Sequence, residues 1–416
     1  MGRFGYGLFA AAIAVSLVCE WSEAAEVRAG VAQAQFALPE RVPLAGYGRR
    51  KGKPSHGIHD PVGVRALVFE QDQTAAALVS CDLLIVDERL FEAVAGRLPA
   101  AGLPPHTVLV LAGTHTHSGP GAYGTRFFEK ISMGHFDAAV FNTLVETIVR
   151  TITEAHRRAG PALLACANAP TEGLVENRMQ PEGLVESALT ACLLSRTEQG
   201  PPEAILVNFA AHPTTLGAWN GFLSGDYPGV VMRALERRFP GATALFFAGA
   251  VGDQAPVKAG IGFERAEWYG QALAQRTIAL IAEMKPGPMP ALHALQEQLP
   301  LAPARLRLGF RWTLPRWLGQ RFVDDDATLS IVAAGPVVWF GVPCDLSAEL
   351  GRRLQEAARA RSLQPMVIGF ASDYIGYCMP ASVYRTKQYE TLMAFNGSDT
   401  GDSIVARLTQ MLDGVQ

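Results

Sequence analysis

Two histidines that stand two residues apart are the first side chains in this sequence whose types and spacing suggest chemistry. His115 and His117 follow a short apolar run at 108–111 and precede a Ser-Gly-Pro-Gly break. Such a run predicts a buried strand, and residues two apart in a strand project from the same face. We therefore expect two imidazoles side by side at the strand's end, which suits zinc. A His-x-His pair can equally cap a strand end and bond to nearby backbone.

Two further apolar runs end next to a polar side chain that can also bind a metal ion. The run at 205–211 ends directly before His212, and the run at 337–342 is followed by Pro-Cys-Asp345. In open α/β sheets, sites collect outside the carboxyl ends of the strands, and three imidazoles with one carboxylate satisfy zinc. Two simpler interpretations stay open. His212 before a proline is often a structural loop residue, and Asp345 stands where it could merely cap the helix that we expect up to residue 360.

The elements that must position these side chains alternate between short buried strands and amphipathic helices. A linker at 286–290 separates them from a strand-rich part that follows it. This alternation predicts a layered α/β fold with a mixed β-sheet, and the strand ends described above indicate a zinc site at the carboxyl ends of its strands. The strands are expected at 64–69, 74–80, 163–167, 188–194, 243–248, 329–334 and 366–370, and the helices at 88–98, 136–158 and 263–284.

Composition and the amino terminus narrow the class of protein. The 416 residues carry 36 Lys and Arg against 39 Asp and Glu, so charge gives no support for nucleic-acid binding. The 6 cysteines show no CxxC or paired spacing, which favours buried thiols over a disulfide framework. Arg3, an apolar stretch at 8–18 and a Ser-Glu-Ala24 end predict a signal peptide over 1–24. We expect residues 25–416 to be an exported catalytic domain, periplasmic or extracellular.

Several motifs, in order along the chain, match one known family. The segment 114–121 reads Thr-His-Thr-His-Ser-Gly-Pro-Gly, 209–213 reads Phe-Ala-Ala-His-Pro, and 351–354 reads Gly-Arg-Arg-Leu. Asn-Arg at 177–178, Tyr-x-x-Tyr at 374–377, Gln-Tyr-Glu at 388–390 and Ala-Gly-Tyr at 45–47 add to them. On these residues the chain resembles the amino-terminal catalytic domain of the neutral (non-lysosomal) ceramidase family, from about residue 31 to about residue 397.

The resemblance implies a ligand set and an activity. It implies one Zn²⁺, the cofactor, held by five residues: His115, His117, His212, Asp345 and Tyr377. It implies hydrolysis of the amide bond of ceramide or a related N-acyl lipid by a zinc-activated water, with Arg178 and Tyr389 as donors to the developing oxyanion. From the residues alone, Arg178 could form a surface salt bridge and Tyr389 could serve core packing. A lipid substrate also leaves peripheral contact with a membrane open.

Three departures from the family pattern limit what is carried over. The family's serine in Gly-Asp-Val-Ser-Pro is Ala255 here, which excludes nucleophilic attack by a side chain at that position and weakens the case for headgroup recognition. The usual glutamate is Asp345, one methylene shorter. The sequence also stops at Gln416, so we expect no carboxy-terminal immunoglobulin-like domain.

Other functions remain as alternatives. Ser118-Gly119 after His117 does not fit the Asp-His of a metallo-β-lactamase, and no Gly-x-Ser-x-Gly elbow supports a serine hydrolase. An exported binding protein that kept the fold and lost turnover stays open, as does a metallohydrolase acting on an amide or ester outside the sphingolipids.

Overall fold

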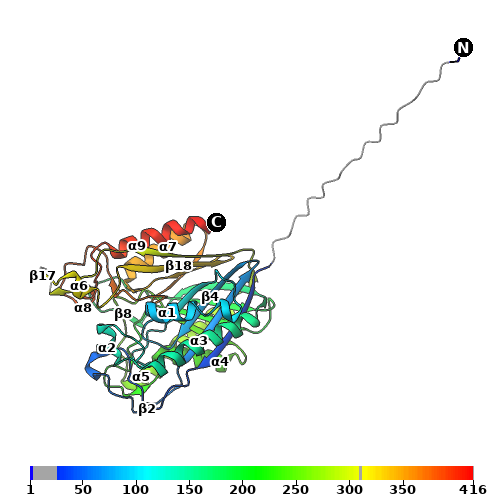
Figure 1. Cartoon of the computed structure of the whole chain (residues 1–416). Helices are drawn as coiled ribbons and strands as arrows, with labels where there is room; N and C mark the ends of the chain where they lie inside the picture. Colours follow the sequence, from blue (N-terminus) through cyan, green and yellow to red (C-terminus); the bar gives the residue numbers. More distant parts are fainter. Residues whose placement is uncertain (3–25, 309–311, 416) are drawn as a thin grey trace.

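The strand that precedes the His-x-His segment belongs to the first of three main sheets (Figure 1). The computed structural model describes residues 1–2, 26–308 and 312–415. The predicted signal peptide therefore lies almost wholly outside the described residues, and its cleavage near Ala24 stays a prediction. In the part of the chain that is described, no helix is long and apolar enough to cross a membrane.

The first sheet has the order β5-β4-β3-β1-β6. β3 and β4 form an antiparallel hairpin in which Gln71 pairs with Thr74, and β4 runs parallel to β5. The parallel pairing brings the carboxyl ends of β4 and β5 to the same edge. The strands are β1 (Arg28–Gln35), β3 (Gly63–Gln71), β4 (Thr74–Cys81), β5 (Val108–Gly113) and β6 (Gly160–Pro161).

The second sheet has the order β12-β10-β9-β7-β14, and β10 runs parallel to β12. Its last strand, β14, lies within the segment predicted as a linker, where Gly287 and Pro288 pair with β7. The division of the chain at 286–290 stays a prediction. The strands are β7 (Leu163–Pro170), β9 (Ala188–Ser195), β10 (Ala204–Phe209), β12 (Thr243–Ala248) and β14 (Gly287–Pro288).

The third sheet is built from the strand-rich part of the chain, in the order β15-β18-β19-β21. β19 and β21 are parallel, so their carboxyl ends also share an edge. Its strands are β15 (Leu292–Pro300), β18 (Asp326–Ala334), β19 (Val337–Gly341) and β21 (Gln364–Ile368). Among the described residues, four two-stranded pieces complete the strands: β2 (Gly57–Ile58) with β11 (Phe222–Leu223), β8 (Val175–Asn177) with β13 (Gln254–Pro256), β16 (Arg307–Leu308) with β17 (Trp312–Thr313), and β20 (Asp345–Leu346) with β22 (Tyr377–Cys378).

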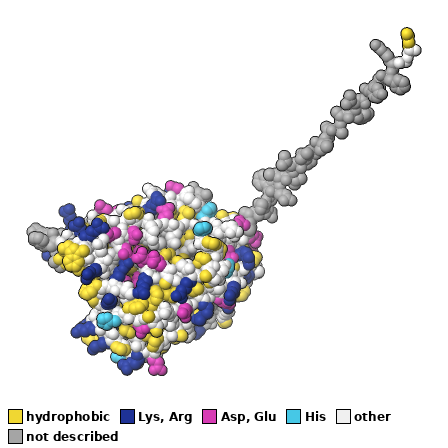
Figure 2. Space-filling view, in the orientation of Figure 1, with side chains coloured by type: hydrophobic (Ala, Val, Ile, Leu, Met, Phe, Trp, Pro, Cys, Tyr) yellow, Lys and Arg dark blue, Asp and Glu magenta, His cyan; other side chains and the backbone are white. Residues whose placement is uncertain are grey.

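Long helices cover the sheets on their outer faces. The helices on the side of the first two sheets are α1 (Glu88–Ala95), α3 (Ala138–Arg157), α4 (Asp226–Arg238) and α5 (Gly262–Ala282). Those that cover the third sheet are α7 (Ala348–Arg359) and α9 (Thr400–Met411). The short helices are α2 (Phe127–Met133), α6 (Arg316–Gly319), α8 (Tyr389–Leu392), η1 (Gly48–Arg50), η2 (Pro99–Ala101) and η3 (Leu412–Gly414). Figure 2 shows charges of both signs interspersed with apolar side chains on the face in view, in keeping with the near-balanced charge.

Both faces of the central strands are buried, which explains their almost continuous apolar sequences. In β3, Val64 and Val68 face the helix-covered cluster, whereas Leu67 and Phe69 face the layer between the sheets. There the ring of Phe69 lies 5.4 Å from that of the buried Trp339 of β19, joining the first and third sheets. The predicted mixed α/β architecture is therefore confirmed.

The cysteines from residue 81 onward are free thiols, four of them buried. Cys166 and Cys192 lie opposite each other on β7 and β9, with their sulfur atoms 2.6 Å apart. Most of the thiols are thus part of the core, as the sequence predicts.

Candidate metal centre

Three imidazole rings from two sheets converge on one point. His115 and His117 follow β5 of the first sheet, and His212 follows β10 of the second. Their Nε2 atoms are 2.8 Å apart for His115 and His212, 3.2 Å for His117 and His212, and 3.3 Å for His115 and His117. These are the residues that form a possible metal-binding group within the described chain.

The spacing of these nitrogen atoms is close to that around a single tetrahedral metal ion, since two pairs lie 3.2 and 3.3 Å apart and the third pair, at 2.8 Å, is closer. Two nitrogens bound to one zinc at about 2.0–2.1 Å and at a tetrahedral angle lie about 3.3 Å apart. Nδ1 of His115 donates to the carbonyl oxygen of Leu84 at 2.7 Å, which leaves the lone pair of its Nε2 directed at the other two rings. A proton shared between two of these nitrogen atoms satisfies that pair only, whereas a metal ion at the centre satisfies all three lone pairs, so the donor set favours a bound metal.

The backbone reaches this geometry differently from the sequence prediction. β5 ends at Gly113, and His115 has a φ of 62°, in the left-handed region. The prediction that His115 and His117 lie on one face of a strand is therefore wrong. The amides of Thr114 and His115 donate instead to the carbonyl oxygens of Cys81 and Leu83, at 2.7 and 3.0 Å. These bonds turn the chain so that both rings face His212.

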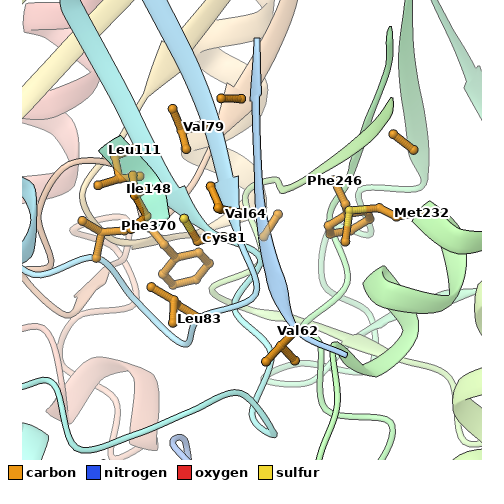
Figure 3. Packing of buried hydrophobic residues seen from close by; sticks show 14 of the residues in the cluster. Val62, Val64, Val79, Cys81, Leu83, Leu111, Ile148, Met232, Phe246 and Phe370 are labelled. Atoms are coloured by element: carbon orange, nitrogen blue, oxygen red, sulfur yellow. The ribbon is translucent and has the colours of Figure 1, made fainter. Parts of the chain in front are cut away.

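Aromatic and glycine neighbours hold the rings in place. The ring of Phe370 stacks on that of His115, with centroids 3.6 Å apart and planes 5° from parallel. Figure 3 shows Phe370 close to Cys81, the last residue of β4, and to Leu83, which follows that strand. His117 lies against Gly46, where an added Cβ would be 2.7 Å from its Cβ, Cγ and Nδ1 atoms.

Asp345 places a buried carboxylate beside two of the three rings. Its Oδ1 is 3.7 Å from Nε2 of His115 and 3.9 Å from Nδ1 of His212. Its Oδ2 accepts a hydrogen bond from the hydroxyl of Tyr374 at 2.8 Å. Oδ1 has no hydrogen-bond partner among the described residues, so this oxygen is available to a ligand. Asp345 is fully buried.

The alternative that Asp345 merely caps a helix is wrong, as is a helix start at this residue. α7 begins at Ala348, and the hydroxyl of Ser347 caps it by accepting from the amide of Leu350 at 3.4 Å. Asp345 lies instead in β20, paired in parallel with Tyr377 of β22. This pairing turns its side chain to the cluster rather than to the helix.

Tyr377 and Arg178 form the wall next to Asp345. One terminal nitrogen of Arg178, Nη2, donates to the hydroxyl oxygen of Tyr377 at 2.9 Å and to the carbonyl oxygen of Gly252 at 2.7 Å. Its Nε lies 2.9 Å from the carboxylate of Glu390. Arg178 is therefore a partly buried residue anchored by three groups, not a surface salt bridge.

Tyr389 and Ala255 lie at the margin of this wall. The ring of Tyr389 meets that of Tyr377 edge-on, with centroids 5.6 Å apart, but 57% of the residue is exposed. Core packing therefore does not account for it. Ala255 lies in β13, opposite Glu176 of β8. The ligand roles of His115, His117, His212, Asp345 and Tyr377 and the catalytic roles of Arg178 and Tyr389 stay predictions.

Burial sets the protonation of the cluster. It lowers the pKa of His115 to about 3 and the pKa values of His117 and His212 well below the ordinary value, and the nearby charge of Arg178 lowers all three further. The imidazoles are therefore neutral at neutral pH, as metal ligation requires. Burial raises the pKa of Asp345 to about 7, against the opposing effects of Arg178 and the tyrosine hydroxyls.

Several supporting residues were not among the predicted site residues. The ring of Tyr47 packs on His117 with centroids 4.8 Å apart, and Arg50 donates to the carbonyl oxygen of His117 at 2.5 Å. Tyr374 and Phe370 act on Asp345 and His115 as described above. The Ala-Gly-Tyr motif at 45–47 and the Tyr-x-x-Tyr motif were visible signals, but nothing local marked Arg50 or Phe370.

The part of the chain that carries the three histidines matches a known protein family. Residues 37–263 match the family described as neutral/alkaline non-lysosomal ceramidase, N-terminal. The chain is 27% identical over 224 residues to a neutral ceramidase of Mycobacterium tuberculosis, covering 49% of this chain and 34% of that protein. It is 32% identical over 141 residues to a neutral ceramidase of Pseudomonas aeruginosa, covering 33% of this chain and 21% of that protein. The match thus spans about a third or less of these relatives.

Solved structures have a similar fold over a longer part of the chain than the sequence matches cover. The crystal structure of neutral ceramidase from Pseudomonas aeruginosa superimposes with a TM-score of 0.82 at 20% identity, covering 94% of this chain and 74% of that one. A structure titled "Ceramidase complexed with C2" gives a TM-score of 0.83 at 18% identity, covering 94% and 75%. The fold is therefore shared over almost the whole chain.

Proposed function

The chain belongs to the neutral/alkaline non-lysosomal ceramidase family, and from that membership we propose that it is an exported, zinc-dependent hydrolase of the amide bond in ceramide or a related N-acyl lipid. Family membership implies an amidase, and a protein that shares this fold is titled "Ceramidase complexed with C2". The observation that carries the proposal is the convergence of three Nε2 atoms within 2.8–3.3 Å of one another. Export is proposed from the leader-like residues 1–24.

The choice of zinc follows from the donor set. Imidazole nitrogens suit zinc, copper, iron and nickel, whereas three protein ligands with a carboxylate nearby and an open position are typical of catalytic zinc sites. His115, His117 and His212 would hold the ion. The free Oδ1 of Asp345 would supply the negative charge that balances it, with Tyr374 fixing the other carboxylate oxygen.

The residues around the cluster provide the rest of the chemistry. When bound, zinc polarises a carbonyl group and activates water for attack. Arg178 stays charged, and its charge reaches all three histidines, so it stabilises negative charge that develops on the amide oxygen. Its bond to Tyr377 orients that hydroxyl toward the same region. Ala255 carries no hydroxyl, so no side chain can attack from that position, and water is the proposed nucleophile.

The test combines metal analysis with a substrate screen. The protein is expected to bind about one zinc per chain, as for a site with one set of ligands. It is expected to hydrolyse N-acylsphingosines or simpler N-acyl amines in a chelator-sensitive way. His117→Ala removes metal and activity together, whereas the exposed His135→Ala keeps both. Zinc binding without turnover of any N-acyl amide or ester would support the binding-protein alternative, and activity without zinc would refute the ligand assignment.

A further inference from the structure

An exposed apolar surface lies next to Arg50, which bonds to the backbone of His117. Two cavities of about 170 and 600 Å³ open on it and share Trp219 and His56 in their walls. Four large apolar side chains are exposed there: Trp219 by 84%, Ile261 by 81%, Ile58 by 52% and Phe222 by 40%. We call Trp219, Ile261, Ile58 and Phe222, together with the adjacent Arg49 and Lys53, the Trp219 surface.

Neighbouring elements bring these side chains together from distant parts of the chain. β2 and β11 pair in parallel, which sets Ile58 beside Phe222. Trp219, Phe222 and Ile261 line the larger cavity. β2 and the helix α5, which begins just after Ile261, lie at the end of the molecule away from α7 and α9 (Figure 1). A cluster of exposed large apolar side chains marks a surface that is covered in use.

The charge of the surface indicates what covers it. The charged residues lining the two cavities are Arg49, Arg50, Lys53 and Arg265, and the linings contain no carboxylate. The guanidinium of Arg49 lies over the ring of Trp219, 4.2 Å from its centroid. Since the whole chain has a net charge of −3, this local excess of positive charge is a feature of the surface itself. Exposed apolar side chains among cations are complementary to a bilayer that contains anionic lipid.

The surface is continuous with the metal centre. Arg50, in the wall of the smaller cavity, donates to the carbonyl oxygens of His117 at 2.5 Å and of Gly217 at 3.1 Å. The ring of Tyr47 lies between them, 4.9 Å from the Arg50 guanidinium and 4.8 Å from the His117 ring. A single layer of residues therefore separates the surface from a metal ligand.

We propose that the Trp219 surface seats on an anionic lipid bilayer, with Trp219 and Ile261 among the headgroups and with Arg49 and Lys53 against the lipid phosphates. The proposal rests on the proposed function in one respect, because binding to a bilayer brings the enzyme to its substrate only if that substrate is a lipid. Seating at this end holds the metal centre close to the bilayer from which an N-acyl lipid is taken.

The charge contribution is tested by co-sedimentation with vesicles of phosphatidylcholine alone or mixed with phosphatidylglycerol. Wild-type protein is expected to bind the mixed vesicles more tightly and to be released by salt. Arg49→Gln and Lys53→Gln each weaken that binding about fivefold, the typical contribution of one cation near an anionic surface. The matched control, Arg352→Gln on α7, leaves it unchanged. If vesicle binding does not depend on anionic lipid, or if Arg352→Gln weakens it as much as the other two substitutions do, the proposal is overturned.

The apolar contribution is tested with Trp219→Ser combined with Ile261→Ser. This pair is expected to weaken binding to both kinds of vesicle, while Trp268→Ser, which removes an exposed tryptophan that lines neither cavity, does not. Unchanged thermal midpoints show that the variants fold. If ultracentrifugation shows that the pair dissociates a dimer and vesicles are never bound, a second copy covers the surface and the proposal fails.

A water-soluble N-acyl substrate separates this proposal from the proposed function. Hydrolysis of that substrate by protein that does not bind vesicles refutes the seating and leaves the hydrolase standing. Vesicle binding that depends on Trp219 and Arg49, without hydrolysis of any substrate, supports the seating and refutes the hydrolase.

Discussion

Replacing Gly46 with alanine tests whether His117 is held where a metal needs it. Gly46 has a φ of 107°, and an added Cβ would lie 2.7 Å from Cβ, Cγ and Nδ1 of His117. Carbon atoms in contact normally lie about 3.5–4.0 Å apart. Gly46→Ala therefore forces the ring or the Gly46 loop to move by about 0.8 Å or more. His115 cannot follow this movement, because Phe370 stacks on its ring.

Gly102 provides a control with the same backbone strain. Its φ is 97°, and no atom lies within 4 Å of an added Cβ. Either alanine costs about 1 kcal/mol because a side chain enters the left-handed region. Gly46→Ala adds the overlap with His117, which costs about 1–3 kcal/mol. It also lowers metal affinity by about 10–100-fold, the usual loss when a residue that positions a metal ligand is changed.

Urea unfolding of the metal-free proteins measures the stability difference, and competition with a chromogenic chelator measures metal affinity. We expect Gly46→Ala to be less stable than Gly102→Ala and to bind metal more weakly, while Gly102→Ala binds as the wild type does. Equal stability of the two variants would show that His117 does not lie against Gly46. Lost stability with unchanged metal affinity would show that His117 is not a ligand.

Three further predictions concern the site and a buried carboxyl. His212→Ala removes metal and activity together, whereas His135→Ala leaves both intact, as measured by metal analysis after dialysis. Arg178→Met lowers kcat by about 10²–10³-fold, the effect of losing one oxyanion donor, without changing metal content; a change in KM alone would argue against this role. Burial raises the pKa of Asp373 to about 8. Between about pH 4 and 8 the folded protein therefore holds a proton on this carboxyl that the unfolded chain has lost. The free energy of unfolding falls as pH rises through this range, by up to about 1.4 kcal/mol per pH unit. Asp373→Asn should flatten that fall in urea unfolding across this pH range, and an unchanged slope would contradict the burial of this carboxyl.

Local sequence patterns predicted the strands well, because each buried strand is a short apolar run with turn residues at its ends. The expected strand at 243–248 has the observed bounds of β12, and the expected strand at 329–334 lies within β18. The rule that side chains gather at the carboxyl ends of parallel strands also grouped His212 with His115, although 97 positions separate them. Strand order was not needed for that step.

The sequence could not predict contacts that depend on how remote segments meet. Arg50 donates to the backbone of both His117 and Gly217, and its Arg-Arg-Lys neighbourhood suggests only a basic loop. Asp345 was ambiguous because an aspartate before a helix is a common cap. Ser347, two residues further on, takes that role here, and only the pairing of β20 with β22 shows which residue does so.

Three residues at the site have a left-handed backbone conformation. His115, Phe370 and Ser372 all have φ between 57° and 67°, which costs about 1–3 kcal/mol for each such residue. Their two segments lock together: the amide of Gly113 donates to the carbonyl oxygen of Phe370 at 3.3 Å, and the amide of Ser372 donates to Leu111 at 2.7 Å. The strained turns thereby stack Phe370 on His115 and aim its Nε2 at the other two imidazoles. A simple extension of β5 would avoid the strain but would leave no such convergence, so the strain accompanies the assembly of the three imidazoles.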